Sequence, residues 1–303
     1  MSDALDNQQL DRSLRKKASF WIRFLPRRLT ARWRKLPNFL ILGTQKGGST
    51  SLYDHIGLHP DVAVSPRKEI NYFSNEHQRG EYWYRMFFPF KSSSLTFCGE
   101  ASPAYIINPY AAGRIRELIP DCRLIVLLRN PAERAISHYY HSFKKGRETL
   151  PLMDALQQES TRIDDEWATI LRDKNYSSRT HNVYSYCQRG KYADQLQRYF
   201  EHFDRDQILI IDSDDFFSQP QKTMRLVFNF VGVNQPDEAY FEQLKPRNVN
   251  SLKKDVDVAA YRYLLDYYRT PNQELYRITG VNYNWESKIE ALIEKHADTS
   301  AEE

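Results

Sequence analysis

The amino-acid sequence predicts an α/β fold of three layers, P-loop-like, in which helices flank a central parallel sheet of about five strands. The first observation behind this prediction is that an apolar run, a glycine-rich turn and the start of a helix follow one another at residues 39–56. The second is that further short apolar runs alternate with helical patterns, which is typical of parallel sheets covered by helices. The runs expected as strands are 39–42, 62–64, 95–98, 123–129 and 207–211.

The glycine-rich turn after the first strand has the features of a phosphate-binding loop. Gly43, four intervening residues and Gly48-Ser49-Thr50 nearly match a Walker A loop, but serine stands where the Walker lysine belongs, and Lys46 lies in mid-loop. Backbone N–H groups at a helix N-terminus, together with the helix dipole, attract phosphate. The alternative is a glycine turn without a ligand. We favour a site for a phosphate-like group, formed by Lys46, Gly47, Gly48, Ser49, Thr50 and Ser51.

A second anion site is predicted where the strand 123–129 ends. Asn130 is a typical helix N-cap, and Pro131 suits the first helical position. Arg129 therefore lies at the carboxyl end of a strand and beside a helix N-terminus, while Ser137 follows about two turns into that helix. A guanidinium in this place suits a second phosphate. The alternative is that Arg129 pairs with a neighbouring carboxylate.

Charged residues also follow the second and the last strands. Ligand groups of open α/β sheets gather at the carboxyl ends of strands, so Lys68 and Glu69 can face the phosphate loop. The alternative is an exposed surface pair. The carboxylates of 212–215 could indicate a metal, but Asp is favoured at helix starts, and we expect them to cap a helix at 219–231.

Composition excludes several classes of protein. The net charge of +4 gives no indication of nucleic-acid binding, and three distant cysteines suggest neither a disulfide framework nor a metal site. No apolar run reaches about 18 residues and no signal peptide is evident, so we expect a cytoplasmic protein without a transmembrane helix. The many aromatic residues, 20 Tyr and 16 Phe, suit a cleft that stacks on a base or on sugar rings.

The chain divides into a basic and aromatic extension (1–37), a main domain (38–285) and an acidic tail (286–303). Basic and aromatic residues alternate within 12–35, so this segment can make a peripheral contact with an anionic membrane. The alternative is a solvated extension that packs its aromatic residues on the domain. The polar segment 144–185 is expected as a helical insertion or a mobile lid. Other expected helices are 80–90, 109–118, 190–203, 258–268 and 271–279.

Four segments, by their order and spacing, resemble the sulfotransferases that use 3′-phosphoadenosine 5′-phosphosulfate (PAPS). They are most similar to the branch that sulfates carbohydrates, as the heparan sulfate sulfotransferase domains do. The segments are 43–52 with His59-Pro60, then 68–73, 100–105 and 129–137. Residues 190–203 and 271–285 are weaker matches, and the resemblance extends over residues 38–285.

The resemblance implies a role for each predicted site residue. The loop from Lys46 to Ser51 would hold the 5′-phosphosulfate, and Arg129 with Ser137 would hold the 3′-phosphate. Lys46 would stabilise the charge on the bridging oxygen, and Glu69 would be the general base toward a hydroxyl or amine of a glycan or small acceptor. The reaction would need no metal. Heparan-type enzymes carry lysine at the position of Ala101, which is a departure in this sequence.

Two other functions are compatible with the sequence. An ATP-dependent kinase could use the same loop, but it would need a metal-binding carboxylate and a lysine next to Ser49-Thr50. A non-catalytic module could bind sulfated or phosphorylated ligands, although Glu69 beside the loop would hinder the binding of an anion. The sequence makes no prediction of the oligomeric state.

Overall fold

The central sheet has five parallel strands in the order β2-β3-β1-β4-β5. The computed structural model describes residues 24, 26–244 and 256–299. The strands are β1 Phe39–Gly43, β2 Val62–Val64, β3 Phe97–Ala101, β4 Arg123–Leu128 and β5 Ile208–Asp212. The predicted fold class is therefore confirmed, and all five apolar runs expected as strands contribute to the sheet.

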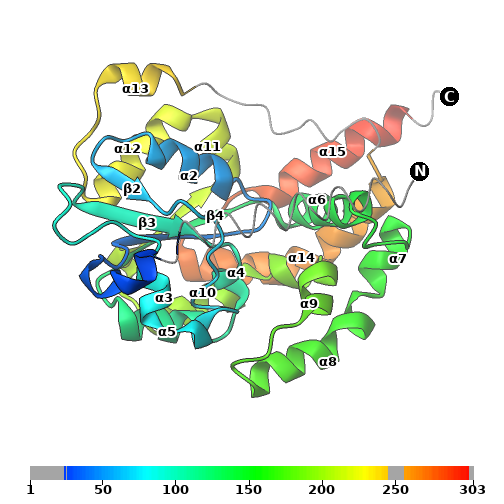
Figure 1. Ribbon diagram of the computed structural model, residues 1–303. Coiled ribbons are helices and arrows are strands. Elements are labelled where there is room, and N and C mark those ends of the chain that lie inside the picture. Colours follow the sequence, from blue (N-terminus) through cyan, green and yellow to red (C-terminus); the bar gives the residue numbers. More distant parts are fainter. Residues whose placement is uncertain (1–23, 25, 245–255, 300–303) are drawn as a thin grey trace, which may run out of the picture.

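Alternate residues of the central strands pack on opposite faces of the sheet, which produces the three layers (Figure 1). Phe39 and Ile41 contact the layer that contains α2 Ser49–Gly57, α11 Ser213–Ser218, α12 Pro220–Val231 and α13 Glu238–Glu242. Leu40 and Leu42 contact the opposite layer, formed by α3 Glu81–Arg85, α4 Ala104–Ile107, α5 Ala111–Leu118 and α10 Tyr192–Phe200. Successive residues of a strand point alternately toward these two apolar layers. The residues that point either way are therefore apolar, which explains the unbroken apolar runs in the sequence.

A third apolar cluster joins four of the remaining helices (Figure 1). It joins α6 Pro131–Lys144, α7 Leu152–Gln157, α14 Val258–Thr279 and α15 Trp285–Thr299. Helix α15 covers most of the expected acidic tail, and its Ile289 and Ile293 are buried in this cluster. None of the helices in the described ranges combines the length and apolar character needed to cross a bilayer.

The segment 144–185 is helical, as expected, and it is anchored to the domain. It contains α7, α8 Glu159–Arg172 and α9 Arg179–Tyr184. The Tyr186 hydroxyl donates a hydrogen bond of 2.8 Å to the buried carboxylate of Glu148. The buried carboxylate of Glu159 accepts from the backbone N–H groups of Cys187 and, at 2.7 Å, of Gln188. Two buried carboxylates therefore fasten this segment to the turn that precedes α10.

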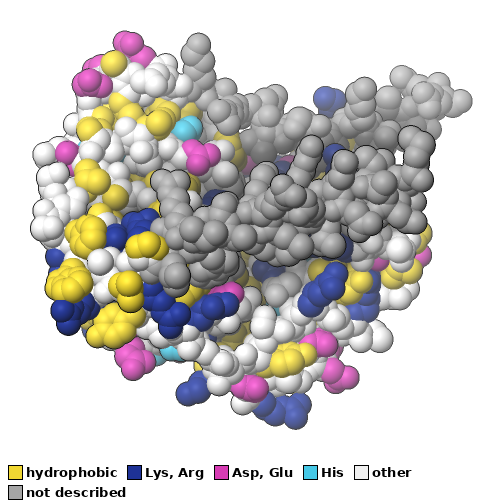
Figure 2. All heavy atoms as spheres, in the orientation of Figure 1, with side chains coloured by type: hydrophobic (Ala, Val, Ile, Leu, Met, Phe, Trp, Pro, Cys, Tyr) yellow, Lys and Arg dark blue, Asp and Glu magenta, His cyan; other side chains and the backbone are white. Residues whose placement is uncertain are grey.

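The described part of the N-terminal extension packs on the domain. Phe24 is buried against Phe87, with ring centroids 5.5 Å apart, and Arg34 donates to the Phe88 carbonyl at 2.8 Å. Figure 2 shows Lys and Arg side chains interleaved with hydrophobic ones in the region where Figure 1 places α3 and the beginning of the described chain. Residues 12–23 and 25 of the proposed membrane-contact segment lie outside the described residues. From residue 26 to 35 the chain lies on the domain through Ala31 and Arg34, but Leu29 and Trp33 are exposed, so this part agrees only partly with the alternative of a packed extension.

Several helix boundaries differ from the predictions. Helix α3 ends at Arg85 rather than near residue 90, and Pro109 lies before α5 instead of in its first turn. Residues 258–279 form one helix, although Pro271 lies inside it. Both halves of α14 bury side chains of the same apolar stripe, including Leu264 and Leu275, and this packing outweighs the backbone hydrogen bond that proline removes.

The carboxylate of Asp212, at the end of β5, caps a different helix from the one expected. Asp212 accepts from the N–H of Asp214 at 3.0 Å and so caps α11. Helix α12 instead begins with Pro220 after Gln219, whose side chain makes no capping bond. The prediction that these carboxylates cap a helix at 219–231 was therefore wrong, because an additional short helix intervenes.

Candidate active site

The loop between β1 and α2 is a tight turn held by hydrogen bonds to neighbouring elements. Gly43, Lys46 and Gly48 have positive φ angles of 91°, 71° and 101°. The N–H of Thr44 donates to the Leu127 carbonyl of β4 at 2.6 Å, and the Ser213 hydroxyl donates to the Gly47 carbonyl at 2.5 Å. A Cβ added at Gly47 would lie 2.6 Å from the Thr44 hydroxyl oxygen, so only glycine fits there without displacement.

The loop ends in an open helix N-terminus. Gly48 is the N-cap of α2 and has no side chain to accept from the first-turn N–H groups of Ser49, Thr50 and Ser51. These N–H groups and the helix dipole make the turn suitable for an anion. The structure thus places the six predicted loop residues around a single turn.

Lys46 and Arg129 lie together at this turn. A guanidinium nitrogen of Arg129 donates to the Lys46 carbonyl at 3.2 Å. Burial lowers the pKa of Lys46, and the positive charges of Arg129 and Lys145 lower it further. Cations gathered in a half-buried place without a matching number of carboxylates favour a bound anion.

Arg129 combines both of the roles that the sequence left open. It follows β4 directly, and its guanidinium pairs with Glu133 of α6 at 3.0 Å, so the alternative of a carboxylate pair is observed. Its Nε also faces Glu133, at 3.3 Å. Among the described residues, these bonds and the one to Lys46 use three of the five guanidinium N–H groups, so two remain for a ligand within this part of the chain. Ser137 is buried two turns further along α6, whose N-terminus Asn130 caps as predicted.

Glu69 follows β2 at the same edge of the sheet as the loop. Its side chain is 57% exposed, and Lys68 Nζ lies 3.9 Å from its carboxylate. Lys68 also donates to the Thr50 hydroxyl in the first turn of α2. Lys68 therefore links the predicted base to the predicted phosphate loop. The Lys68–Glu69 ion pair of the alternative interpretation is therefore present, but it lies beside the predicted phosphate loop.

A cavity of about 470 Å³ opens beside Glu69. One wall comes from the sheet edge, with Gln45, Asn71 and Pro103, and the other comes from the segment after α6, with Arg147, Ser177, Arg179, Asn182 and Arg189. The Gln45 side-chain oxygen is buried and has no hydrogen-bond partner among the described residues. An unpaired buried acceptor in a cavity wall is available to a donor from a ligand or from water in the cavity.

Three arginines make this cavity electropositive. Arg189 is buried and donates to Asn182 at 2.8 Å and to Ser185 at 2.7 Å, and its burial lowers its pKa to about 9, to which the neighbouring Arg134 contributes. Arg147 and Arg179 form no ion pair with a described residue. The sequence-based prediction missed these residues: Arg147 and Arg179 lie in no matching segment, and Arg189 directly precedes the weaker match that begins at Gly190. Only Gln45, adjacent to Lys46, could have been suspected from its position.

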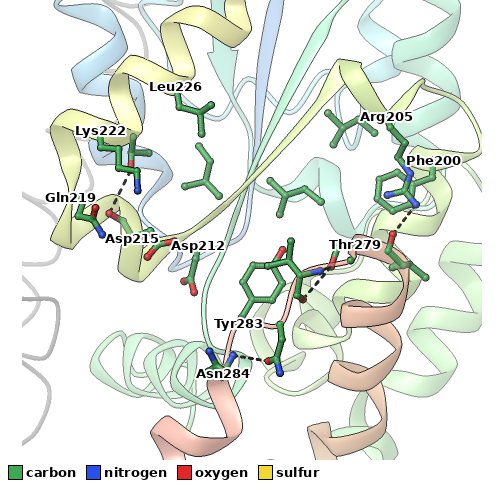
Figure 3. Close-up of a pocket in the computed structure, with 18 of the residues that line it drawn as sticks. Phe200, Arg205, Asp212, Asp215, Gln219, Lys222, Leu226, Thr279, Tyr283 and Asn284 are labelled. Carbon is green, nitrogen blue, oxygen red and sulfur yellow. Dashed lines mark hydrogen bonds between the residues drawn. The ribbon is translucent and has the colours of Figure 1, made fainter.

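A larger cavity, of about 1110 Å³, lies along β5 and contains none of the predicted site residues (Figure 3). Lys222 and Leu226 of α12 line one side, while Phe200, Arg205 and Thr279 line the other. Burial raises the pKa of Asp212 there to about 6, and the Trp285 indole N–H donates to it at 3.2 Å. Within the described ranges, no three His, Cys, Asp or Glu side chains are grouped as a metal site would require.

Known proteins are similar to this chain over most of its length. A family model described as "Sulfotransferase domain" matches residues 36–298. Membrane-associated sulfotransferase kil1 of Dictyostelium discoideum is 26% identical, over 83% of this chain and 67% of that protein. Heparan sulfate glucosamine 3-O-sulfotransferase 3B1 of Mus musculus is 27% identical, over 84% of this chain and 66% of that protein. The chain thus spans about two thirds of the length of these relatives.

Among solved structures, a sulfotransferase from Alicyclobacillus acidocaldarius has a similar fold. The TM-score is 0.66 and the sequence identity is 26%, over 83% of this chain and 99% of that one.

Proposed function

Because this chain belongs to the sulfotransferase family, we propose that it transfers a sulfuryl group from PAPS to a hydroxyl or amine group of a carbohydrate, with Glu69 as the general base. The family inferred from four sequence motifs is confirmed by the match over residues 36–298. One observation supports the proposed role of Glu69 above all. Its side chain lines the acceptor-sized cavity, while Lys68 connects it to the phosphate loop.

The residues present fit PAPS as the donor. The donor carries anionic groups at its 5′ and 3′ positions, and the predicted phosphate turn lies next to Arg129, which supports a pair of neighbouring sites for them. The turn from Lys46 to Ser51 would hold the 5′-phosphosulfate, and Arg129 with Ser137 would hold the 3′-phosphate. The two unused N–H groups of Arg129 and the half-buried ammonium of Lys46 match these charges.

Each residue would have a definite part in the transfer. Glu69 accepts the proton that the acceptor hydroxyl loses as its oxygen bonds to sulfur. The donor, when bound, supplies the sulfuryl group, and its phosphate oxygen keeps the electron pair of the S–O bond that breaks. Lys46 and the N–H groups of Ser49 and Thr50 stabilise the negative charge that develops on that oxygen.

The cavity supports a carbohydrate acceptor. Asn71, Asn75, Asn182 and Ser177 supply amide and hydroxyl groups for sugar hydroxyls, while Arg147 and Arg179 supply positive charge for an acidic substituent. The relative from Mus musculus is named for a heparan sulfate glucosamine acceptor, which is an acidic carbohydrate. Cytoplasmic location and peripheral membrane contact through residues 12–35 remain predictions of the sequence. Co-sedimentation of the full chain with anionic vesicles tests the second.

The test of this function has two steps. Transfer of radiolabelled sulfate from PAPS is first measured over a panel of heparan sulfate oligosaccharides, neutral oligosaccharides and phenols. Glu69→Gln is then compared with wild type and with Glu201→Gln, a surface carboxyl control. We expect Glu69→Gln to lower turnover by roughly 10²–10⁴-fold, while calorimetric binding of adenosine 3′,5′-bisphosphate hardly changes.

Three results would contradict the proposal. Transfer to phenols alone would exclude a carbohydrate acceptor. Thermal stabilisation by ATP with Mg²⁺ but not by adenosine 3′,5′-bisphosphate in EDTA would favour the kinase. A Glu69→Gln variant within a few-fold of wild-type velocity would remove Glu69 from the mechanism.

A further inference from the structure

The loop that carries Glu69 has an unusual backbone. Glu69 and Asn71 have φ angles of 56° and 58°, in the left-handed region that residues other than glycine seldom adopt. Asn tolerates this region comparatively well, but Glu does not. Such a conformation persists only where the surrounding structure holds it in place.

Three consecutive N–H groups of this loop are held by one short segment at the end of β3. Glu69 N–H donates to the Ala101 carbonyl at 2.9 Å, and Asn71 N–H donates to the Ser102 hydroxyl oxygen at 3.0 Å. The N–H of Ile70, between them, donates to the carboxylate of Glu100. The Ser102 hydroxyl in turn donates to the same carboxylate at 2.6 Å. Glu100 therefore supports the loop directly through Ile70 and indirectly through Ser102.

Glu100 is a costly residue to keep in this place. Its side chain is fully buried, and its remaining hydrogen bonds come from the hydroxyls of Tyr84, at 3.2 Å, and Tyr105. No cation is among these partners, and burial raises the pKa of Glu100 to about 7 although the hydrogen bonds oppose this. Burying a carboxylate without a counter-charge lowers stability, so its presence suggests a functional reason.

We propose that Glu100 is a positioning residue, whose carboxylate fixes the loop 69–71 so that Glu69 faces the acceptor cavity. This inference rests on the proposed function, in which Glu69 is the base. Glu100 is not itself a base toward the acceptor, because its side chain is fully buried and it is not part of the cavity wall. Glu100 would position the loop through the hydrogen bonds that its carboxylate accepts, one from the Ile70 N–H and one from the Ser102 hydroxyl.

The test is a double-mutant cycle of Glu100→Gln with Glu69→Gln. Turnover is measured at saturating PAPS with heparan sulfate oligosaccharides as acceptors. A misplacement of about 1 Å in a reacting group can cost roughly 10²-fold, so we expect Glu100→Gln alone to lower kcat by roughly 10–100-fold. In the Glu69→Gln background we expect less than about a threefold further loss, because the base is already absent. Binding of adenosine 3′,5′-bisphosphate should not change in any variant.

Two further variants keep the test informative if Glu100→Gln folds poorly. Ser102→Ala removes the acceptor of the Asn71 N–H and should give a smaller loss that also disappears in the Glu69→Gln background. Tyr84→Phe is the matched control, because it removes a hydroxyl that donates to Oε1 of Glu100, whereas the Ser102 hydroxyl donates to Oε2. Amide hydrogen exchange needs no acceptor substrate. Exchange at Glu69, Ile70 and Asn71 should become at least roughly tenfold faster in Glu100→Gln and Ser102→Ala, but not in Tyr84→Phe.

The outcomes separate this proposal from the proposed function. The role of Glu100 would be overturned if Glu100→Gln lowered turnover equally in the wild-type and Glu69→Gln backgrounds. It would also be overturned if the loop amides exchanged at the wild-type rate. Either result would leave Glu69 as the base. A Glu69→Gln variant with wild-type turnover would refute the base itself, and with it any action of Glu100 through that base.

Discussion

The buried carboxyl of Glu100 makes part of the pH dependence of stability predictable. Burial raises its pKa in the folded protein from an ordinary value of 4.5 to about 7. Between these two values the folded state keeps a proton that the unfolded state releases. The free energy of unfolding therefore falls as the pH rises through this range, and it levels off above the folded-state pKa. The difference corresponds to roughly 3 kcal/mol.

Replacement by glutamine removes this proton and hence this pH dependence. The free energy of unfolding of Glu100→Gln, minus that of wild type, should rise by roughly 3 kcal/mol between pH 4.5 and pH 8. Urea unfolding followed by circular dichroism at four pH values measures this difference, in which the other titrating groups cancel. Glu201→Gln, at the exposed end of α10, measures the effect of deleting one surface charge.

A difference that stays constant from pH 4.5 to pH 8 would refute this account of Glu100. A difference that falls as the pH rises would show that the hydrogen bonds outweigh burial and stabilise the charged form. Either result would also weaken the view that Glu100 is kept at a cost to stability, without bearing on which residue is the base.

Three further predictions concern the ligand sites. Lys46→Ala should lower sulfate transfer by roughly 10²–10³-fold, and should weaken calorimetric binding of adenosine 3′,5′-bisphosphate far less; equal losses would make Lys46 a ground-state anchor. Arg129→Ala and Ser137→Ala should weaken PAPS binding, but should leave adenosine 5′-phosphosulfate, which lacks the 3′-phosphate, unaffected; loss of both nucleotides alike would refute the assignment. Arg179→Ala should raise the KM for acidic oligosaccharides by roughly tenfold in low salt and leave that for neutral ones unchanged; parallel increases would argue against charge recognition.

Much of the fold could be predicted because the buried strands are nearly uniform in composition. From Phe39 to Leu42 in β1 and from Leu124 to Leu128 in β4, each residue faces one of two apolar layers, so an unbroken apolar run identifies a central parallel strand. The Asn130-Pro131 pair correctly marked the start of α6, since capping depends on neighbours in sequence. The continuity of α14 through Pro271 could not be predicted, because it depends on packing against distant helices.

The site could be predicted only in its local parts. The phosphate turn is contained in one continuous stretch, and Arg129 reaches it because β1 and β4 are neighbours in the sheet. The opposite wall of the cavity is different. Arg179 begins α9, while Arg147 and Arg189 lie just before α7 and just after α9, and only Arg189 adjoins a segment that matches the family, and that match is a weak one. The Glu100 support was hidden for the same reason, since it joins the ends of two strands.

The separation of the two walls has a consequence for the diversification of this enzyme. The proposed donor turn belongs to the sheet and its adjoining helices, whereas half of the residues that line the proposed acceptor cavity belong to the segment 144–190, which is fastened through Glu148 and Glu159. Sequence change in that segment can alter which acceptor is selected and leave the chemistry untouched, provided that the two carboxylate fastenings are kept. Exchange of this segment between relatives, cut outside Glu148 and Gln188, is therefore a rational way to build chimeric sulfotransferases with new acceptors.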